Sequence, residues 1–152
     1  MLIVRLAGPH ETSDLIRLRA LWTAEQAGAP VDDPDFEDRY RAWQENNKRI
    51  MFVAELDGTP IGMLNLMVFE RMPKPGKKSS CWVYLGNVFV SPDHRNRGVG
   101  GKLLEAATTY SQDISAARMV LSPSAQSQNF YRRHGFVPAE ELLVKTSLIP
   151  TD

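Results

Sequence analysis

The chain has 152 residues, a length that fits one domain spanning residues 1–152. Hydrophobic residues make up 43% and charged residues 24%, which is an ordinary globular composition. Lysine plus arginine and aspartate plus glutamate each number 18, so the net charge is zero and no basic excess indicates nucleic acid or an anionic membrane as a partner.

A single cysteine, Cys81, excludes an internal disulfide and is interpreted as a small buried side chain. The N-terminus lacks the basic start and long apolar core of a signal peptide. No uninterrupted apolar run approaches the ~20 residues that a membrane helix needs. The expected location is therefore the cytoplasm.

The first half of the chain predicts one strand and two helices. Residues 2–7 form a short apolar run that Gly8-Pro9 ends, which is typical of a strand. Thr12 or Ser13 is expected to cap a helix whose leucines recur every three or four residues until Gly28-Ala29-Pro30. Asp33-Pro34 predicts the start of a second helix, because aspartate is a good cap and proline suits the first helical position.

The second half predicts the rest of a mixed sheet. Strands are expected at 50–56, 61–69, 81–90, 118–121 and 142–148, with a turn at Asp57-Gly58 and a polar loop over 71–80. Helices are expected at 99–114 and 124–133, the second ended by Gly135. The resulting order, β-α-α-β-β-β-α-β-α-β, predicts an α/β (α+β) fold with helices on both faces of the sheet.

The most informative segment follows the apolar strand that ends in Val88-Phe89-Val90. Ser91-Pro92 leads into a loop with two arginines and three glycines, Arg95-Asn96-Arg97-Gly98-Val99-Gly100-Gly101-Lys102, which opens an amphipathic helix. The first N–H groups of a helix lack internal partners, and the helix dipole favours negative charge there. Glycine lets the backbone approach a ligand closely, so the segment predicts a site for linked phosphates.

Two familiar phosphate motifs do not fit this loop. A Walker loop aligned on Gly101-Lys102 needs glycine at Asn96 and serine or threonine at Leu103. A dinucleotide motif aligned on Gly98 and Gly100 also fails at Leu103, and it would follow the first strand of a parallel unit.

The loop does resemble the cofactor motif of the GNAT superfamily of N-acetyltransferases, which reads [Arg/Gln]-x-x-Gly-x-[Gly/Ala] and here runs from Arg95 to Gly100. The preceding Val90-Ser91-Pro92 and the following helix also match that family. A late helix ending in Tyr131-Arg132-Arg133-His134-Gly135-Phe136 is similar to the family's Tyr-x-x-x-Gly-Phe, although Ser124 stands where the family often has asparagine. The resemblance implies a GNAT-like, mostly antiparallel sheet of about six to seven strands.

The same resemblance implies how acetyl-CoA binds. The backbone of Val88, Phe89 and Val90 pairs with the pantetheine amides like an added strand. The pyrophosphate is held by Arg95 and by the N–H groups of Asn96, Arg97, Gly98, Val99, Gly100 and Gly101. Arg97 and Lys102 add positive charge or are simply solvated.

The resemblance also implies direct acetyl transfer to an amine, with Tyr131 as the general acid that protonates the leaving sulfur. Some family members carry a glutamate four residues before the position of Val88, and Tyr84 stands there instead. Tyr84 either relays a proton through water or shapes the pocket, and the structural role is favoured. Other carboxylates considered for the base are Glu55, Asp33, Asp35 and Glu37.

The acceptor amine is open between a small molecule and a peptide or protein. An acidic cluster either attracts a cationic amine or, as we favour, simply begins a helix; its members are Asp32, Asp33, Asp35, Glu37 and Asp38. His10, His94 and His134 lack ligand-like spacing, so no metal is expected. A homodimer is consistent with the resemblance, and a non-catalytic CoA sensor and a nucleotide-binding module are the alternative functions.

Overall fold

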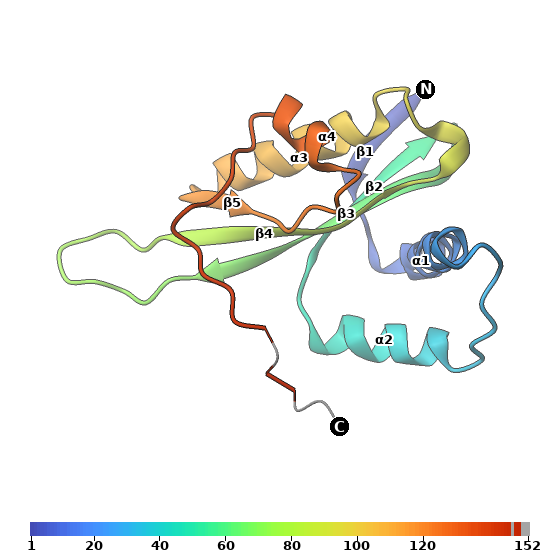
Figure 1. Ribbon diagram of the computed structural model, residues 1–152, viewed down its shortest axis with the longest axis horizontal. Coiled ribbons are helices and arrows are strands. Elements are labelled where there is room, and N and C mark those ends of the chain that lie inside the picture. The colour runs from blue at the N-terminus through green and yellow to red at the C-terminus, as the bar shows by residue number, and fades with distance from the viewer. Residues whose placement is uncertain (147, 150–152) are drawn as a thin grey trace. The chain divides into compact units, whose positions relative to one another are not determined.

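The computed structural model describes residues 1–146, 148 and 149, which form two compact units, Met1–Ser122 and a second that begins at Pro123. In the first unit, five strands form one sheet in sequence order (Figure 1): β1 (Leu2–Leu6), β2 (Ile50–Leu56), β3 (Thr59–Glu70), β4 (Cys81–Val90) and β5 (Arg118–Val120). β1 to β4 are antiparallel, whereas β5 runs parallel to β4. The predicted mixed, mostly antiparallel sheet is confirmed, but with five strands in the described part of the chain rather than six or seven.

Helices cover both faces of this sheet, as predicted (Figure 1). On one face, α1 (Thr12–Ala27) packs against β3 and against α2 (Phe36–Asn46), and Leu15 and Leu18 are buried with Val53. On the other face lies α3 (Val99–Asp113), whose Tyr110 ring is 6.0 Å from that of Phe52. Neighbouring strand residues point to opposite faces, so Phe52 and Val53 mark the two layers of the core. Among the described helices, none is long and apolar enough to cross a membrane.

The two N-terminal helices begin at different kinds of turn. A 3₁₀ turn, Pro9–Glu11, precedes α1, so Glu11 takes the cap position expected for Thr12 or Ser13 and Thr12 is the first helical residue. Gly28, with φ +79°, closes the helix. α2 begins at Phe36, two residues after Pro34. The reason is that Asp33 closes a turn before the helix: its carboxylate accepts the Asp35 N–H at 3.2 Å and its carbonyl accepts the Phe36 N–H at 3.1 Å.

The second unit contains α4 (Gln128–Arg133), which starts later than the expected residue 124. Ser127 donates its N–H to the Ser124 carbonyl at 3.1 Å and the two hydroxyls are 2.9 Å apart, so these serines form a separate turn first. Gly135 follows the helix with φ +89°, as predicted.

The predicted closing strand at 142–148 is wrong for the residues described. Residues 142–146 and 148 are in no strand, and Ser147 lies outside the described residues. Leu143 is 97% exposed and Val144 is 85% exposed. Apolar, β-branched composition favours a strand only where a neighbouring strand supplies hydrogen bonds and a face to pack against, and these residues have neither.

Candidate functional site

β4 has a partner on both edges for only part of its length. Trp82, Val83 and Tyr84 pair with β5, whereas β4 continues to Val90 and pairs with β3 almost throughout. In the described sheet, therefore, the second half of β4 has one free edge. A free edge presents unpaired N–H and C=O groups, which an extended ligand can use.

A β-bulge reshapes this second half. Asn65 lies opposite Gly86 and Met63 lies opposite Phe89, so two residues of β4, Asn87 and Val88, face one residue of β3. Asn87 has φ +55°, a left-handed conformation that few residues other than glycine adopt. The bulge turns the Asn87 amide toward Asn65, whose Nδ2 donates to the Asn87 Oδ1 at 2.8 Å.

The end of β4 places the backbone of Val90 on the free edge. Ser91 donates its N–H to the Ile61 carbonyl at 2.8 Å, and hydrogen-bonded pairs alternate along an antiparallel ladder. The N–H and C=O of Val90, one residue earlier, therefore point away from β3. The carbonyl accepts a bond from Nε of Arg95 at 3.0 Å.

The glycine loop, residues 95–102, connects β4 to α3 through two left-handed residues. Asn96 has φ +60° and Gly98 has φ +80°. Lys102 donates the N–H that closes the first helical turn onto the Gly98 carbonyl at 3.1 Å. The N–H groups of Val99, Gly100 and Gly101 precede that bond and are the unpaired groups of the helix start. Residues 95–98 and Lys102 are exposed and Gly100 and Gly101 are half-buried, while Val99 is buried and fixes the helix start on the sheet.

The Arg95 side chain holds the glycine loop in place. Its guanidinium forms two 2.8 Å contacts with the two carboxylate oxygens of Glu25 on α1. It also lies 5.6 Å from the centre of the Phe89 ring and donates to Val90 as described above. Because these contacts engage its charge and its donors, Arg95 fixes the loop geometry. The backbone N–H groups after Arg95 are then the groups that can bind an anion.

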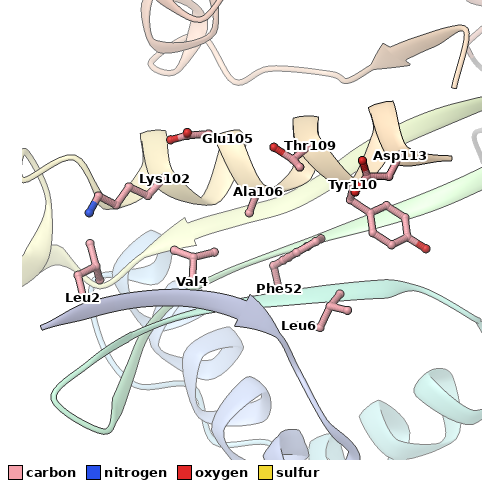
Figure 2. Close-up of a pocket in the computed structure, with 10 residues that line it drawn as sticks. All are labelled: Leu2, Val4, Leu6, Phe52, Lys102, Glu105, Ala106, Thr109, Tyr110 and Asp113. Carbon is pink, nitrogen blue, oxygen red and sulfur yellow. The ribbon is translucent and has the colours of Figure 1, made fainter. Parts of the chain in front are cut away.

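Arg97 and Lys102 provide the loop's unengaged charge. Within the described part of the chain, neither side chain forms a hydrogen bond or an ion pair, and both residues are exposed. Lys102 lies at one end of an open groove of ≈ 540 Å³ between β1 and α3, with Tyr110 and Asp113 toward the other end (Figure 2). The groove lies on the α3 face, and of the residues predicted to bind the cofactor it includes Lys102 only.

A second hollow lies on the opposite face, between the sheet and helices α1 and α2. This α1–α2 pocket has a volume of ≈ 370 Å³ and is lined by Arg19, Phe36, Arg39, Tyr40, Trp43, Met51, Met63, Asn65 and Asn87. Three aromatic rings from α2 form one wall, with 6.1 Å between Phe36 and Tyr40 and 5.5 Å between Tyr40 and Trp43. Burial raises the pKa of the Tyr40 phenol, which therefore stays protonated at neutral pH. A pocket of this size suits a small molecule or a single side chain.

A stack of side chains joins the α1–α2 pocket to the glycine loop. The Arg19 guanidinium lies 4.4 Å from the centre of the Trp22 ring, and Trp22 stacks on Phe89 with 5.5 Å between ring centres. Arg95 lies beyond Phe89. Guanidinium groups favour the faces of aromatic rings, so the stack fixes α1 against β4 between the two regions.

The two tyrosines of the predicted mechanism lie in different units. Tyr84 is paired across from Met67 in the sheet, is 39% exposed, and is not among the residues that line the α1–α2 pocket. Tyr131 lies on α4 in the second unit, where its ring packs against Phe130 at 5.1 Å and Phe136 at 5.6 Å. Burial raises the pKa of the Tyr131 phenol, which therefore stays protonated at neutral pH.

Three of the four carboxylates considered as bases have structural partners. Glu55 accepts a hydrogen bond from Arg5 at 2.6 Å, and Asp33 is ion-paired with Arg39. Glu37 pairs with Arg41 at 2.8 Å, one helical turn away. These contacts agree with the acidic cluster as a helix start. In the described residues, no group of three or more histidine, cysteine, aspartate or glutamate side chains is placed to hold a metal ion.

Sequence reasoning did not find the α1–α2 pocket. Asn65 carried a detectable signal, because a polar residue between Leu64 and Leu66 in a buried strand needs a hydrogen-bonding partner. Arg19 gave none: an arginine on an amphipathic helix is ordinarily solvated. The Asn87 bulge follows from strand register, which one sequence does not reveal.

Known proteins resemble this chain in sequence and in fold. The model of the family described as "Acetyltransferase (GNAT) family" matches residues 16–136. A protein of Bacillus subtilis (strain 168), described as the uncharacterized N-acetyltransferase YhfO, is 29% identical over 100 residues. That match covers 63% of this chain and 64% of the relative, so it spans less than two thirds of the relative's length.

Solved structures share the fold. A predicted acetyltransferase from Clostridium acetobutylicum, solved with acetyl-CoA, has a TM-score of 0.75 at 19% identity, covering 95% of this chain and 96% of its own. A GCN5-related N-acetyltransferase from Ralstonia eutropha JMP134 has a TM-score of 0.71 at 24% identity, covering 95% of this chain and 98% of its own. Identities this low establish the likeness of fold alone.

Proposed function

The chain belongs to the GNAT family of acetyltransferases, and from that premise we propose that it transfers an acetyl group from acetyl-CoA to a primary amine of a small molecule or peptide. The observation that carries the proposal is the glycine loop, with its unpaired helix-start N–H groups, directly after the free edge of β4. The family match crosses the boundary at Ser122, which supports treating residues 1–152 as one acetyltransferase domain.

Acetyl-CoA is proposed to lie along β4 and to end at the glycine loop. Val88, Phe89 and Val90 supply the strand edge for the pantetheine amides, because Val90 directs its N–H away from β3. The pyrophosphate meets the N–H groups from Asn96 to Gly101, with Arg97 and Lys102 adding charge. Arg95 contributes by fixing the loop through Glu25 and Val90.

The proposed reaction is direct. The amine nitrogen attacks the thioester carbonyl carbon, the C–N bond forms, and the C–S bond breaks with the electron pair leaving on sulfur. A backbone N–H near Val90 polarises the carbonyl oxygen. The thiolate takes a proton from Tyr131, whose raised pKa keeps the phenol in its acid form. The amine releases its proton to water, directly or by way of Tyr84.

Thermal denaturation and CoA release test the proposal together. Acetyl-CoA at a hundred times its Kd is expected to stabilise the fold by about 2.7 kcal/mol, while ATP and NAD at equal concentration stabilise it far less. Release of free CoA with a panel of amines then reports transfer. A protein unaffected by millimolar acetyl-CoA would contradict the cofactor assignment.

A non-catalytic acetyl-CoA sensor is the second candidate. It is favoured by one observation: among the described residues that line the α1–α2 pocket, none is an aspartate, glutamate or histidine that could accept the amine proton. A sensor would be stabilised by acetyl-CoA and yet release no CoA with any amine beyond the rate of hydrolysis.

A further inference from the structure

The α1–α2 pocket contains a half-buried arginine, Arg19, with one buried nitrogen that no described residue hydrogen-bonds. Nη1 of Arg19 is buried and has no hydrogen-bond partner among the described residues. Arg19 lines the pocket, and its guanidinium lies over the Trp22 ring at 4.4 Å from the ring centre, which restricts its position. A guanidinium keeps its charge at any physiological pH, and a buried N–H left unbonded costs free energy. A ligand oxygen would remove that cost.

The charges of the pocket favour an anion. Its charged lining residues are Arg19 and Arg39, and no carboxylate lines it. Arg39 is already ion-paired with Asp33, so Arg19 is the cation left to a ligand. The acidic residues before α2 do not line the pocket, so no carboxylate in its lining would attract a purely cationic amine.

The remaining walls favour an apolar body. Phe36, Tyr40 and Trp43 form one wall, and Met51 and Met63 contribute from the sheet. Asn65 and Asn87 add a neutral hydrogen-bonded pair at the β4 bulge. A volume of ≈ 370 Å³ is near the lower end for small-molecule pockets, so the occupant is about the size of an amino acid or one peptide terminus.

The location agrees with the acceptor side of the proposed reaction. Asn87 immediately precedes the three β4 residues proposed to bind pantetheine. The stack from Arg19 through Trp22 to Phe89 joins the pocket to that same strand. We infer that the α1–α2 pocket binds the acceptor, an inference that rests on the proposed acetyl transfer. The acceptor is a small amine with an apolar body and a carboxylate, and Arg19 binds the carboxylate.

The test compares amines in matched pairs, each a carboxylate and its carboxamide: phenylalanine and phenylalaninamide, leucine and leucinamide, β-alanine and β-alaninamide. For each pair, kcat/KM for the acid is divided by kcat/KM for the amide. The readout is this ratio in wild type divided by the same ratio in Arg19→Gln. Dividing the two ratios cancels the intrinsic reactivity of each amine and any loss of folded protein. For the preferred pair we expect a factor of about ten or more, as one charge-assisted hydrogen bond predicts.

Two further variants sharpen the result. Arg19→Lys keeps the charge without the planar fork and is expected to retain part of the preference. Arg41→Gln removes an arginine from the same face of the sheet, outside the pocket lining, and is expected to keep the wild-type ratio. An acid-to-amide ratio that Arg19→Gln leaves unchanged for every pair would overturn the inference and leave acetyl transfer intact.

Where turnover is too slow to measure, binding affinities test the inference. Calorimetry with CoA present compares N-acetylphenylalanine with its carboxamide, and N-acetylleucine with its carboxamide. Tighter binding of the acids by wild type, lost in Arg19→Gln, supports the inference, whereas equal or absent binding contradicts it. Acetyl-CoA stabilisation of each variant is measured alongside, because its absence in wild type would instead contradict the proposed function.

Discussion

The glycine loop and the α1–α2 pocket both border β4, but the loop is built from backbone groups and the pocket from side chains. The loop is one continuous segment that offers backbone N–H groups, set by the left-handed residues Asn96 and Gly98. The pocket collects side chains from α1, α2, β2, β3 and β4, far apart in the sequence. A backbone-built site depends on which φ angles the chain can adopt, whereas a side-chain-built site depends on which residues are present.

This difference predicts that related proteins share the cofactor site and differ in the acceptor pocket. A phosphate cradle of backbone groups keeps its shape under most substitutions outside its few special positions. A pocket of side chains changes its chemistry with each replacement, so acceptor preference can diverge while the cofactor stays the same. The following predictions test the contrast, from the largest effect on function to the smallest.

The largest effect is expected where one side chain supplies the chemistry. Tyr131→Phe removes the proposed acid while leaving the ring that packs on Phe136. General acid catalysis is worth 10² to 10⁴ in rate, so we expect turnover to fall by about a hundredfold with little change in acetyl-CoA affinity. Steady-state CoA release and calorimetry measure the two quantities separately.

The matched control is Tyr110→Phe, on the α3 face, which should leave both quantities at their wild-type values. An unchanged turnover number in Tyr131→Phe would remove Tyr131 from the mechanism.

A smaller effect on binding is expected at Gly98. Its φ of +80° strains any other residue, while a Cβ there would meet no atom within 4 Å, so Gly98→Ala tests conformation without crowding. A left-handed alanine costs about 1–2 kcal/mol, and acetyl-CoA affinity should fall about tenfold if binding requires this conformation. Gly76→Ala is the control, because Gly76 has φ +72° with equally open space, outside the glycine loop. Equal affinities in the two variants would mean that the Gly98 conformation does not matter for binding.

The smallest effect is expected at the ion pair that holds the loop. Arg95 and Glu25 are 41% and 35% exposed, so the solvent screens their attraction. A double-mutant cycle with Arg95→Gln and Glu25→Gln should give a coupling of about 0.2–1 kcal/mol in the free energy of unfolding. The coupling should shrink as salt rises. A salt-independent coupling would point to packing on Phe89 instead of charge.

The same contrast explains what the sequence revealed. The glycine loop was predictable because its glycines, arginines and following helix are adjacent in the chain, and local rules of helix starts suffice to interpret them. Most strands and helices were predictable for the same reason, as at Gly28, where a left-handed glycine ends α1. The family resemblance rested on these local motifs.

Features that depend on strand pairing or on the packing of distant elements could not be predicted from the sequence. Residues 142–148 have strand-like composition, but a strand exists only where another offers its edge, and composition carries no such information. The α1–α2 pocket depends on which residues of distant elements share a face, and at Asn87 that alternation is shifted by an extra residue. Arg19 becomes notable only once its burial over Trp22 is known.

That extra residue has a consequence for how this protein can change over generations. Before the bulge, Val83 and Leu85 face α3; after it, Phe89 faces α1 because one position has been added. Deleting a single residue between them would rotate Phe89 toward α3 and break the stack with Trp22, whereas replacing a residue leaves the facing of the other β4 residues unchanged. We therefore expect related chains to preserve the length of β4 more strictly than the identity of its individual residues.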